Sequence, residues 1–428
     1  MGIAHGWIAP TLKLLQNSNR EFSLTTEQCS WVASLQDFGR ILGPILSIWL
    51  IDLIGRKKVL ASCTILFFFT WLLVVFTRSV AVIYAVRLLY GFTAGLNDAT
   101  ATIYLGENSK PKLRGIFSGI SITFFYAAVL IEICIAIYFS YETVAIVNTI
   151  LSLLTFPCIY FGVEPVQFLV MKERYEEAEN NFNFLRGVRQ TDKTEFEKIK
   201  SDIHEMLIKK LTFKELIATP SYYKSVIKVL ILCTLIMATG SAAIFSFVSI
   251  TFSELNVLQS NNLTILFGLL QFASVCCCSF IIEKVNRRTM LLISLVFVTI
   301  LHACTTTLYY VHKNISDISH LMWLCFIAIT MYSMIFIGGI IPVVFAIRGE
   351  LFSQNLKNVG GAFAVIGNSL MAFCTTKIFL LISKRFGIYA NFAIYSIASL
   401  FTIIYVYFFI PETRGKSLIE IQNKQNNI

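Results

Sequence analysis

Eleven long apolar runs constrain the fold of this 428-residue chain more than any other feature of its sequence. Each run is close to the roughly 20 mostly apolar residues that an α-helix needs to cross a bilayer. The runs cover residues 30–53, 59–77, 81–105, 116–138, 143–163, 225–252, 262–283, 290–310, 321–347, 360–383 and 390–410. Because 56% of the residues are hydrophobic and 14% are charged, the chain has too little polar surface to coat a soluble domain of its length. We therefore predict an all-α polytopic membrane protein.

A twelfth apolar run, from Met1 to Leu15, is too short to span a bilayer. It has no basic segment before it and no small-residue cleavage site after it, so a signal peptide is a poor explanation. We expect a first helix that is truncated here. An incomplete chain is the alternative, because about ten further apolar residues before Met1 would restore a spanning helix.

Acidic and basic residues recur at the same spacings in the two halves of the chain. The pairs are Asp52 with Arg56 and Glu283 with Arg287, four residues apart, and Glu107 with Arg114 and Glu350 with Lys357, seven residues apart. The equivalent acids of the two halves are separated by 231 positions in the first case and by 243 in the second. Such similar separations indicate an internal duplication. We assign residues 1–163 to an N-terminal transmembrane bundle, 225–410 to a C-terminal transmembrane bundle and 411–428 to a cytoplasmic tail.

Residues 164–224 form the one sizeable polar stretch, and we predict that it is a cytoplasmic helical linker. Its apolar residues recur every three or four positions, at Tyr175, Ala178, Phe182 and Leu185 and again at Phe196, Ile199, Ile203 and Leu207. That periodicity is typical of short amphipathic helices. A mobile linker is the alternative, although Pro and Ser are too few for a typical disordered segment.

Basic residues cluster in every second loop, which predicts that those loops are cytoplasmic. The net charge of +10 then reflects topology and anionic lipid headgroups rather than nucleic acid. The glycosylation sequons at Asn262 and Asn314 both fall on the opposite side. We expect a multi-pass glycoprotein of the plasma membrane. Nearly all of the 11 cysteines lie inside apolar runs, so no disulfide framework is indicated.

Several short motifs follow one another in a characteristic order. They are Gly6-Trp7 with Pro10, Ser30-Trp31-Val32, Asp52 with Gly55-Arg56-Lys57, Arg87 with Gly91, Tyr104-Leu105-Gly106-Glu107, Arg114-Gly115, Gly349-Glu350-Leu351-Phe352, and Pro411-Glu412-Thr413-Arg414-Gly415-Lys416-Ser417-Leu418. From residue 6 onward, the chain resembles the sugar porters of the major facilitator superfamily, and most of all the insect facilitators of trehalose and glucose. The resemblance implies two pseudo-symmetric six-helix bundles. It also implies facilitative transport of a neutral sugar, such as trehalose, glucose or a similar hexose, by alternating access.

The repeated charges predict a gate at the cytoplasmic side. A base at a helix end that faces carboxylates of a neighbouring helix makes charge-assisted hydrogen bonds, which can clamp two bundles together when that side is closed. We expect Arg56 to pair with Glu107 and Arg287 with Glu350. The full predicted network is Asp52, Arg56, Glu107, Arg114, Glu164, Glu283, Arg287, Glu350, Lys357 and Glu412. The alternative is that the bases only fix the topology. Compared with the family, Lys357 replaces the usual Arg and Asn286 the usual Gly, so we expect a weaker gate in the second half.

The sugar site departs from the family pattern. The family's seventh helix usually carries paired glutamines and an Asn, whereas residues 236–242 keep only a Gly, and the fifth helix has Ile122 where many relatives have Gln. Sugars need polar partners for their hydroxyls and an aromatic face. The remaining candidates for substrate binding are Gln271, Asn368, Phe345, Thr239 and Gly240, with Pro342 as a hinge because it removes a backbone hydrogen bond. Hydrogen bonds between helices, or simple packing, are the alternative roles for these side chains.

Some charges within the apolar runs are not explained by the family. They are Asp37, Arg40, Asp98, Glu132 and Lys377. Charged groups inside a membrane are costly and are usually paired or functional. Asp37 and Arg40 lie three residues apart on one helical face, so we expect them to pair with each other. A proton-coupled relative is expected to carry an Asp in the first helix, and residues 1–15 contain none. We therefore prefer passive transport to proton symport, with Asp98 and Glu132 as the residues that would overturn this choice.

No metal cluster, activated nucleophile or phosphate-binding glycine loop is present in the sequence, so we expect neither an enzyme nor a cofactor. The expected partners are a small sugar and the lipid bilayer, with no nucleic acid, and the oligomeric state is left open. The main alternative is a transport-inactive relative that acts as a sensor or regulator, because the glutamines are missing and the first helix is short. A proton-coupled sugar symporter is the other.

Overall fold

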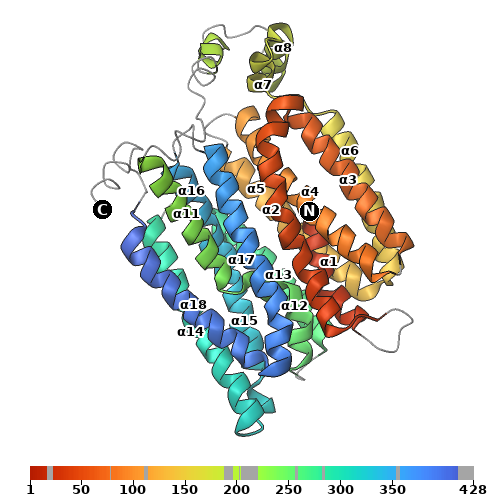
Figure 1. The fold of residues 1–428 in the computed structure, drawn as a ribbon, viewed down its shortest axis with the longest axis vertical. Helices are drawn as coiled ribbons and strands as arrows, with labels where there is room; N and C mark the ends of the chain where they lie inside the picture. The colour runs from red at the N-terminus through yellow and green to blue at the C-terminus, as the bar shows by residue number, and fades with distance from the viewer. Residues whose placement is uncertain are drawn as a thin grey trace.

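The structure is a computed structural model that describes residues 1–16, 23–77, 79–109, 114–187, 196–201, 203, 220–255, 259–281, 285–352 and 357–412. For a few of these residues, Arg114 and Lys357 among them, only the backbone is described. The described secondary structure is helical throughout (Figure 1). All eleven predicted runs form helices, because a chain in lipid satisfies its backbone hydrogen bonds within each segment.

The helices of the first half precede two short helices that lie at one end of the molecule, which we call the linker end (Figure 1). The first half consists of α1 (Gly2–Leu15), α2 (Thr26–Ile54), α3 (Arg56–Phe76), α4 (Val80–Asn108), α5 (Arg114–Tyr138) and α6 (Tyr141–Tyr160). The two short helices are α7 (Val166–Met171) and α8 (Tyr175–Arg186). Together with Phe196 and Ile203, Ala178 and Phe182 of α8 form a small separate core, as the predicted amphipathic pattern requires.

The second half begins at α11 and ends at α18. It consists of α11 (Pro220–Ala238), α12 (Ser241–Ser253), α13 (Ser260–Ile281), α14 (Arg287–Asn314), η2 (Ser319–Leu321), α15 (Trp323–Ile335), η3 (Phe336–Ile340), α16 (Ile341–Leu351), α17 (Lys357–Arg385) and α18 (Ile388–Phe409). Two predicted runs are interrupted. Residues 225–252 break at Gly240, and residues 321–347 contain a π-helical turn at η3. Such breaks are tolerated inside a membrane only where protein covers the freed backbone groups.

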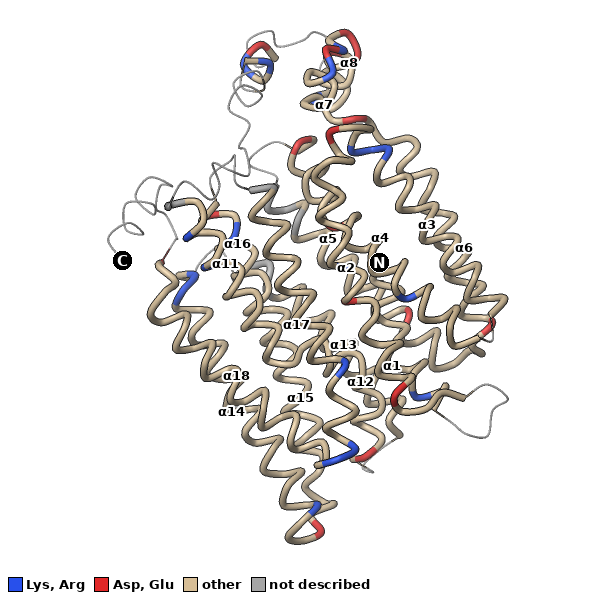
Figure 2. The backbone as a smooth tube through the Cα atoms, viewed as in Figure 1, with Lys and Arg blue, Asp and Glu red and all other residues tan. Residues whose placement is uncertain are grey.

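Among the described residues, ten helical stretches are long and apolar enough to cross a membrane. The helix α2 is not one of them, although it has 29 residues, because it carries Glu27, Asp37, Arg40 and Asp52. The helix α1 has 14 residues. Charged residues are frequent at the linker end and sparse along the helices (Figure 2).

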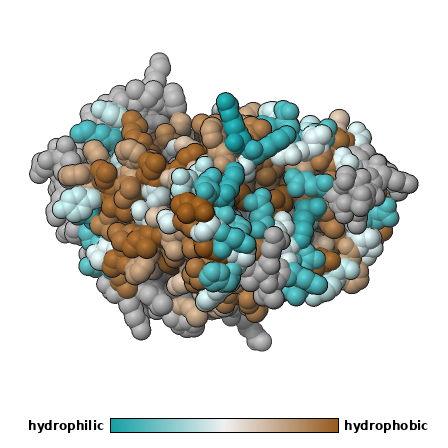
Figure 3. Space-filling view, turned by 90° about the horizontal axis from the view of Figure 1, so that it is seen from below, coloured by the Kyte–Doolittle hydropathy of each residue, from teal (hydrophilic) through white to brown (hydrophobic). Residues whose placement is uncertain are grey.

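Among the described residues, the most extensive contacts between the two halves involve three pairs of helices. The helix α2 packs against α17, α5 against α13, and α1 against α12. Within the first half, α2 also packs closely on α4. Glycine at position 91 permits this approach, since a Cβ there would stand 1.9 Å from the carbonyl oxygen of Gln36. The end opposite the linker carries both sequon asparagines, Asn262 and Asn314, whose side chains are exposed, and we call it the sequon end. Hydrophilic residues gather across the middle of that face (Figure 3).

Candidate functional site

The first charge cluster joins three helices at the linker end. Arg56, the first residue of α3, donates from Nη2 to Glu107 Oε1 of α4 at 3.0 Å, and its Nη1 lies 3.6 Å from Asp52 Oδ1. The guanidinium also donates to the carbonyl of Ile51 and lies 5.4 Å from the ring centroid of Phe168 on α7. Only 6% of the Arg56 side chain and 11% of the Glu107 side chain are exposed. A desolvated pair of this kind holds its helices firmly, since removal of one partner would leave a buried charge.

Glu164, which follows α6, completes this cluster from the other side of α3. Its Oε1 accepts a hydrogen bond of 3.1 Å from the backbone N–H of Lys57, and its backbone carbonyl accepts one from Asn181 of α8. A carboxylate is favoured at the start of a helix because unpaired N–H groups and the helix dipole attract it. Gly55 has φ +97° and passes so close that a Cβ there would stand 2.8 Å from Glu164 Oε1. Glu164 therefore ties the linker to the start of α3.

The second half repeats this arrangement with looser geometry. Arg287, the first residue of α14, has Nε 3.6 Å from Glu350 Oε1 of α16, and the two side chains are 15% and 32% exposed. Glu412 accepts hydrogen bonds from the backbone N–H groups of Arg287 at 3.0 Å and Arg288 at 3.1 Å. Asn286 makes no side-chain cap at this helix start. Glu412 thus caps α14 as Glu164 caps α3, which follows from the internal duplication.

Both predicted ion pairs lie within one half of the molecule. Arg56 and Glu107 belong to the first half, and Arg287 and Glu350 to the second. In this conformation the pairs therefore hold helices of the same half together, and neither clamps the two halves. Glu283 lies outside the described residues, and the side chains of Arg114 and Lys357 are also outside what the structure describes.

Two of the predicted sugar contacts have unpartnered polar atoms. Gln271, on α13, is 3% exposed, and its Nε2 makes no hydrogen bond with the described residues. Asn368, on α17, is half-buried, and its Oδ1 also makes no hydrogen bond with the described residues. A buried amide atom without a partner is costly, so such atoms are suited to a ligand that brings hydroxyl groups.

Thr239 and Gly240 are both buried in this conformation, and their role as substrate contacts stays a prediction. The Thr239 side chain is fully buried and shares a 3.3 Å hydrogen bond with the Tyr332 hydroxyl. A Cβ on Gly240 would stand 2.3 Å from the ring of Tyr395 on α18. With φ +86°, Gly240 forms the break between α11 and α12, and its neighbours pack it against the interior of the second half.

Phe345 and Pro342 both belong to α16, after the π-helical turn. The Phe345 ring is 55% exposed and lies under the guanidinium of Arg348, 5.1 Å from its centroid. Pro342 stands at the start of α16 directly after η3, and it has no N–H to donate to the preceding turn. Because η3 directly precedes it, the irregular backbone is concentrated at the predicted hinge.

The prediction that Asp37 and Arg40 pair with each other is wrong, because the ion pair of Arg40 is with another residue. Arg40 instead forms an ion pair with Asp98 of α4. The physical reason is the close packing of α2 on α4, which brings a longer side chain from α2 within reach of the neighbouring helix. Asp37 Oδ2 accepts a 3.5 Å contact from Thr376 Oγ1 on α17, in the other half. Glu132 accepts a 2.8 Å hydrogen bond from Asn148 and is fully buried.

Lys377 makes a contact between the halves that the sequence did not predict. From α17, its Nζ donates to Ser30 Oγ on α2 at 2.8 Å and lies 3.8 Å from the ring centroid of Trp31. Phe373, one turn away, packs its ring against Trp31. The sequence signals were the charge at Lys377 and the Ser30-Trp31 motif, but nothing in the sequence joined them.

A second contact between the halves lies near the sequon end. Lys13 of α1 donates to Ser260 Oγ and, at 3.4 Å, to Asn261 Oδ1 at the start of α13. The contacts of Lys13 and Lys377 both lie toward the sequon end of their helices. These hydrogen bonds hold the two halves together there, whereas the ion pairs described at the linker end stay within each half.

Known proteins match this chain over nearly its whole length. A family model described as "Sugar (and other) transporter" matches residues 5–424. The facilitated trehalose transporter Tret1 of Polypedilum vanderplanki is 26% identical over 99% of this chain and 85% of its own length. The sugar transporter ERD6-like 6 of Arabidopsis thaliana is 24% identical over 99% of this chain and 87% of its own length. The inward-open structure of the xylose transporter XylE from E. coli has a TM-score of 0.80 at 17% identity, covering 99% of this chain and 97% of that one, so the two share a fold.

Proposed function

The chain belongs to the sugar transporter family, and we propose that it carries a neutral sugar passively across the membrane by alternating access. Its fold is that of the major facilitator transporters. The observation that carries the proposal is that the family model spans residues 5–424, so the match includes both halves and the linker between them. Relatives that match 99% of this chain are facilitated trehalose transporters of insects, which supports trehalose or glucose as the cargo.

In this proposal the two linker-end charge clusters form the cytoplasmic gate in the conformation in which that end is closed, whereas in the described conformation each stays within its own half. Each cluster pairs a base at a helix start with carboxylates of neighbouring helices, through Arg56 in the first half and Arg287 in the second. Each also includes a carboxylate that caps the same helix, Glu164 or Glu412. The clusters make each linker end rigid, so that the halves rock as units around a site between them. Pro342 and the adjoining π-helical turn supply the bend in the second half.

Gln271 and Asn368 are the amides that we assign to the sugar in the second half. Both have an unpartnered polar atom, which a sugar hydroxyl satisfies. Phe345 is the aromatic candidate because its ring is exposed. We prefer passive transport to proton coupling because Gly2–Leu15 contains no acidic residue, Glu132 is buried against Asn148, and Asp98 forms an ion pair with Arg40. We further propose a plasma-membrane location, with glycans on the exposed residues Asn262 and Asn314, and no enzymatic activity.

Uptake and exchange of labelled trehalose and glucose in oocytes test the function. We expect saturable uptake that does not change with external pH, together with exchange when the gradient is zero. Glycosidase treatment of surface-labelled protein verifies expression, with the double variant Asn262→Gln, Asn314→Gln as the control without glycans. A protein that reaches the surface but moves neither sugar would contradict transport and favour a sensor. Uptake that rises with an inward proton gradient would instead favour a symporter.

A further inference from the structure

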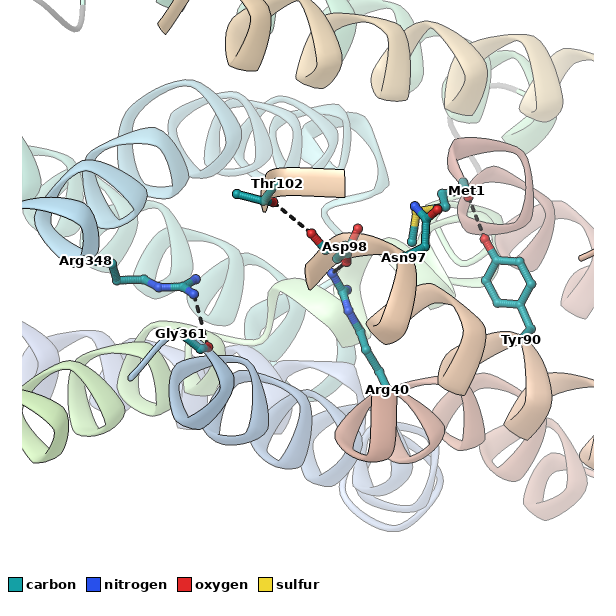
Figure 4. A network of polar contacts seen from close by, with 8 residues as sticks. All are labelled: Met1, Arg40, Tyr90, Asn97, Asp98, Thr102, Arg348 and Gly361. Carbon is teal, nitrogen blue, oxygen red and sulfur yellow. Dashed lines mark hydrogen bonds and ion pairs between the residues drawn. The ribbon is translucent and has the colours of Figure 1, made fainter. Parts of the chain in front are cut away.

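An ion pair between Arg40 and Asp98 lies at the middle of α2. Arg40 stands 14 residues from either end of α2, and it donates from Nη2 to Asp98 Oδ2 of α4 (Figure 4). Charged side chains at this depth are costly in a membrane protein and are rarely kept without a role. The proposed gate lies at the linker end and makes no use of this pair.

The exposure of the pair distinguishes it from a structural clamp. The side chains of Arg40 and Asp98 are 41% and 35% exposed, against 6% and 11% for Arg56 and Glu107. Both pairs connect to α4, but only the deeper one leaves polar atoms open to solvent. Asp98 Oδ1 makes no hydrogen bond with the described residues, and the buried Nε of Arg40 is unpartnered.

The pair faces the other half of the molecule. Asp37, one turn before Arg40 on the same face of α2, contacts Thr376 of α17. Arg348 of α16 interacts electrostatically with Arg40, and in Figure 4 its guanidinium group extends toward the pair. Arg348 itself donates to the carbonyl of Gly361 at 3.3 Å. The Arg40–Asp98 pair therefore lies on the surface along which the two halves face each other.

The surface around the pair carries charged groups of both signs. Arg40 pairs with Asp98, and Asp37 interacts electrostatically with both Arg40 and Arg87. This group therefore offers both strong donors and strong acceptors, which neutral polyols need.

We propose that the Arg40–Asp98 pair recognises the hydroxyl groups of the sugar, in place of the amides that residues 236–242 lack. Asp98 accepts hydrogen bonds from two neighbouring hydroxyls, and the remaining N–H groups of Arg40 donate to their oxygens. This assignment rests on the proposed function and gives it a polar subsite in the first half, in addition to the two amides, Gln271 and Asn368, assigned in the second half.

Sugar binding to the purified full-length protein and sugar uptake in oocytes test the assignment together. We expect Asp98→Asn to raise both the Kd and the KM for the transported sugar about tenfold to a hundredfold, because a charge-assisted hydrogen bond becomes a neutral one. Arg40→Lys should do the same, since a single ammonium group replaces the planar donor set. The matched control is Arg174→Gln, which breaks an exposed pair with Glu177 on the linker.

Deoxy analogues of the sugar separate recognition from structural support. Each analogue lacks one hydroxyl. We expect one or two of them to bind wild type at least tenfold more weakly than the parent sugar, and to lose no further affinity in Asp98→Asn. A purely structural pair would weaken every analogue equally, or lower the melting temperature and the surface amount without changing Kd. Either result, or an unchanged Kd, would overturn the assignment. If wild type binds and moves sugar normally, the proposed function survives that failure; if wild type binds no sugar at all, both fall.

Discussion

Gly240 shows how one residue fixes the shape of a membrane segment. It adopts φ +86°, and a Cβ at this position would stand 2.3 to 2.5 Å from three atoms of the Tyr395 ring. The backbone conformation and the close approach both require glycine. The predicted run over residues 225–252 therefore bends at a point where α18 can pack against the break.

Gly240→Ala is expected to destabilise the protein by about 3 kcal/mol. The left-handed conformation costs roughly 1–2 kcal/mol and overpacking against Tyr395 roughly 1–3 kcal/mol. The change is measured as the shift in thermal unfolding of the purified protein in detergent. Gly106→Ala is the control, because no atom lies within 4 Å of a Cβ there. Equal shifts in the two variants would show that Gly240 has no special constraint.

The duplicated charge clusters act at the scale of helices. In the first half, the ion pair joins α3 to α4 with short geometry and little exposure, and in the second half it joins α14 to α16 at 3.6 Å with more exposure. The ion pair of the second half is thus longer and more exposed than that of the first. This difference is consistent with the expected weaker second cluster and does not depend on Lys357. Coulomb attraction and desolvation both grow as water is excluded, so the two clusters should differ in energy.

Arg56→Met is expected to cost more stability than Arg287→Met. We expect about 3–5 kcal/mol for the first change, which leaves the buried Glu107 carboxylate uncompensated, and about 1 kcal/mol for the second, where water reaches Glu350. Unfolding by heat or denaturant in detergent gives the comparison directly. Restoration of stability in Arg56→Met, Glu107→Gln relative to Arg56→Met would support the stated reason. Losses of the same size in the two halves would contradict it.

At the scale of the whole molecule, the two halves are held at the sequon end. Lys377 joins α17 to Ser30 and Trp31 of α2, and Lys13 joins α1 to the start of α13. Alternating access requires that these contacts break when the sequon end opens. They therefore contribute to the balance between the two conformations rather than to the stability of either half.

Lys377→Met is expected to increase the population open at the sequon end roughly tenfold. Lys377 is half-buried, so its cation–π contact contributes about 1 kcal/mol and its hydrogen bond to Ser30 about 1 kcal/mol more, and 1.4 kcal/mol corresponds to a factor of ten. The readout is faster hydrogen exchange of the backbone amides in residues 26–34 of α2. Lys384→Met, on the same helix, is the control and should leave this exchange unchanged. Unaltered exchange in Lys377→Met would mean that the contact does not hold the halves together.

The sequence by itself determined which segments are helices and which charges form clusters. Apolar length predicts spans because lipid forces backbone groups to pair within a segment, and spacing predicts the clusters because duplication repeats it. Only the tertiary structure decided where Arg40 pairs, that Thr239 and Gly240 face inward, and that Lys377 reaches Trp31. These contacts join residues far apart in the chain, and they depend on how closely helices such as α2 and α4 approach. Sequence periodicity does not predict that distance, since it describes one helix at a time.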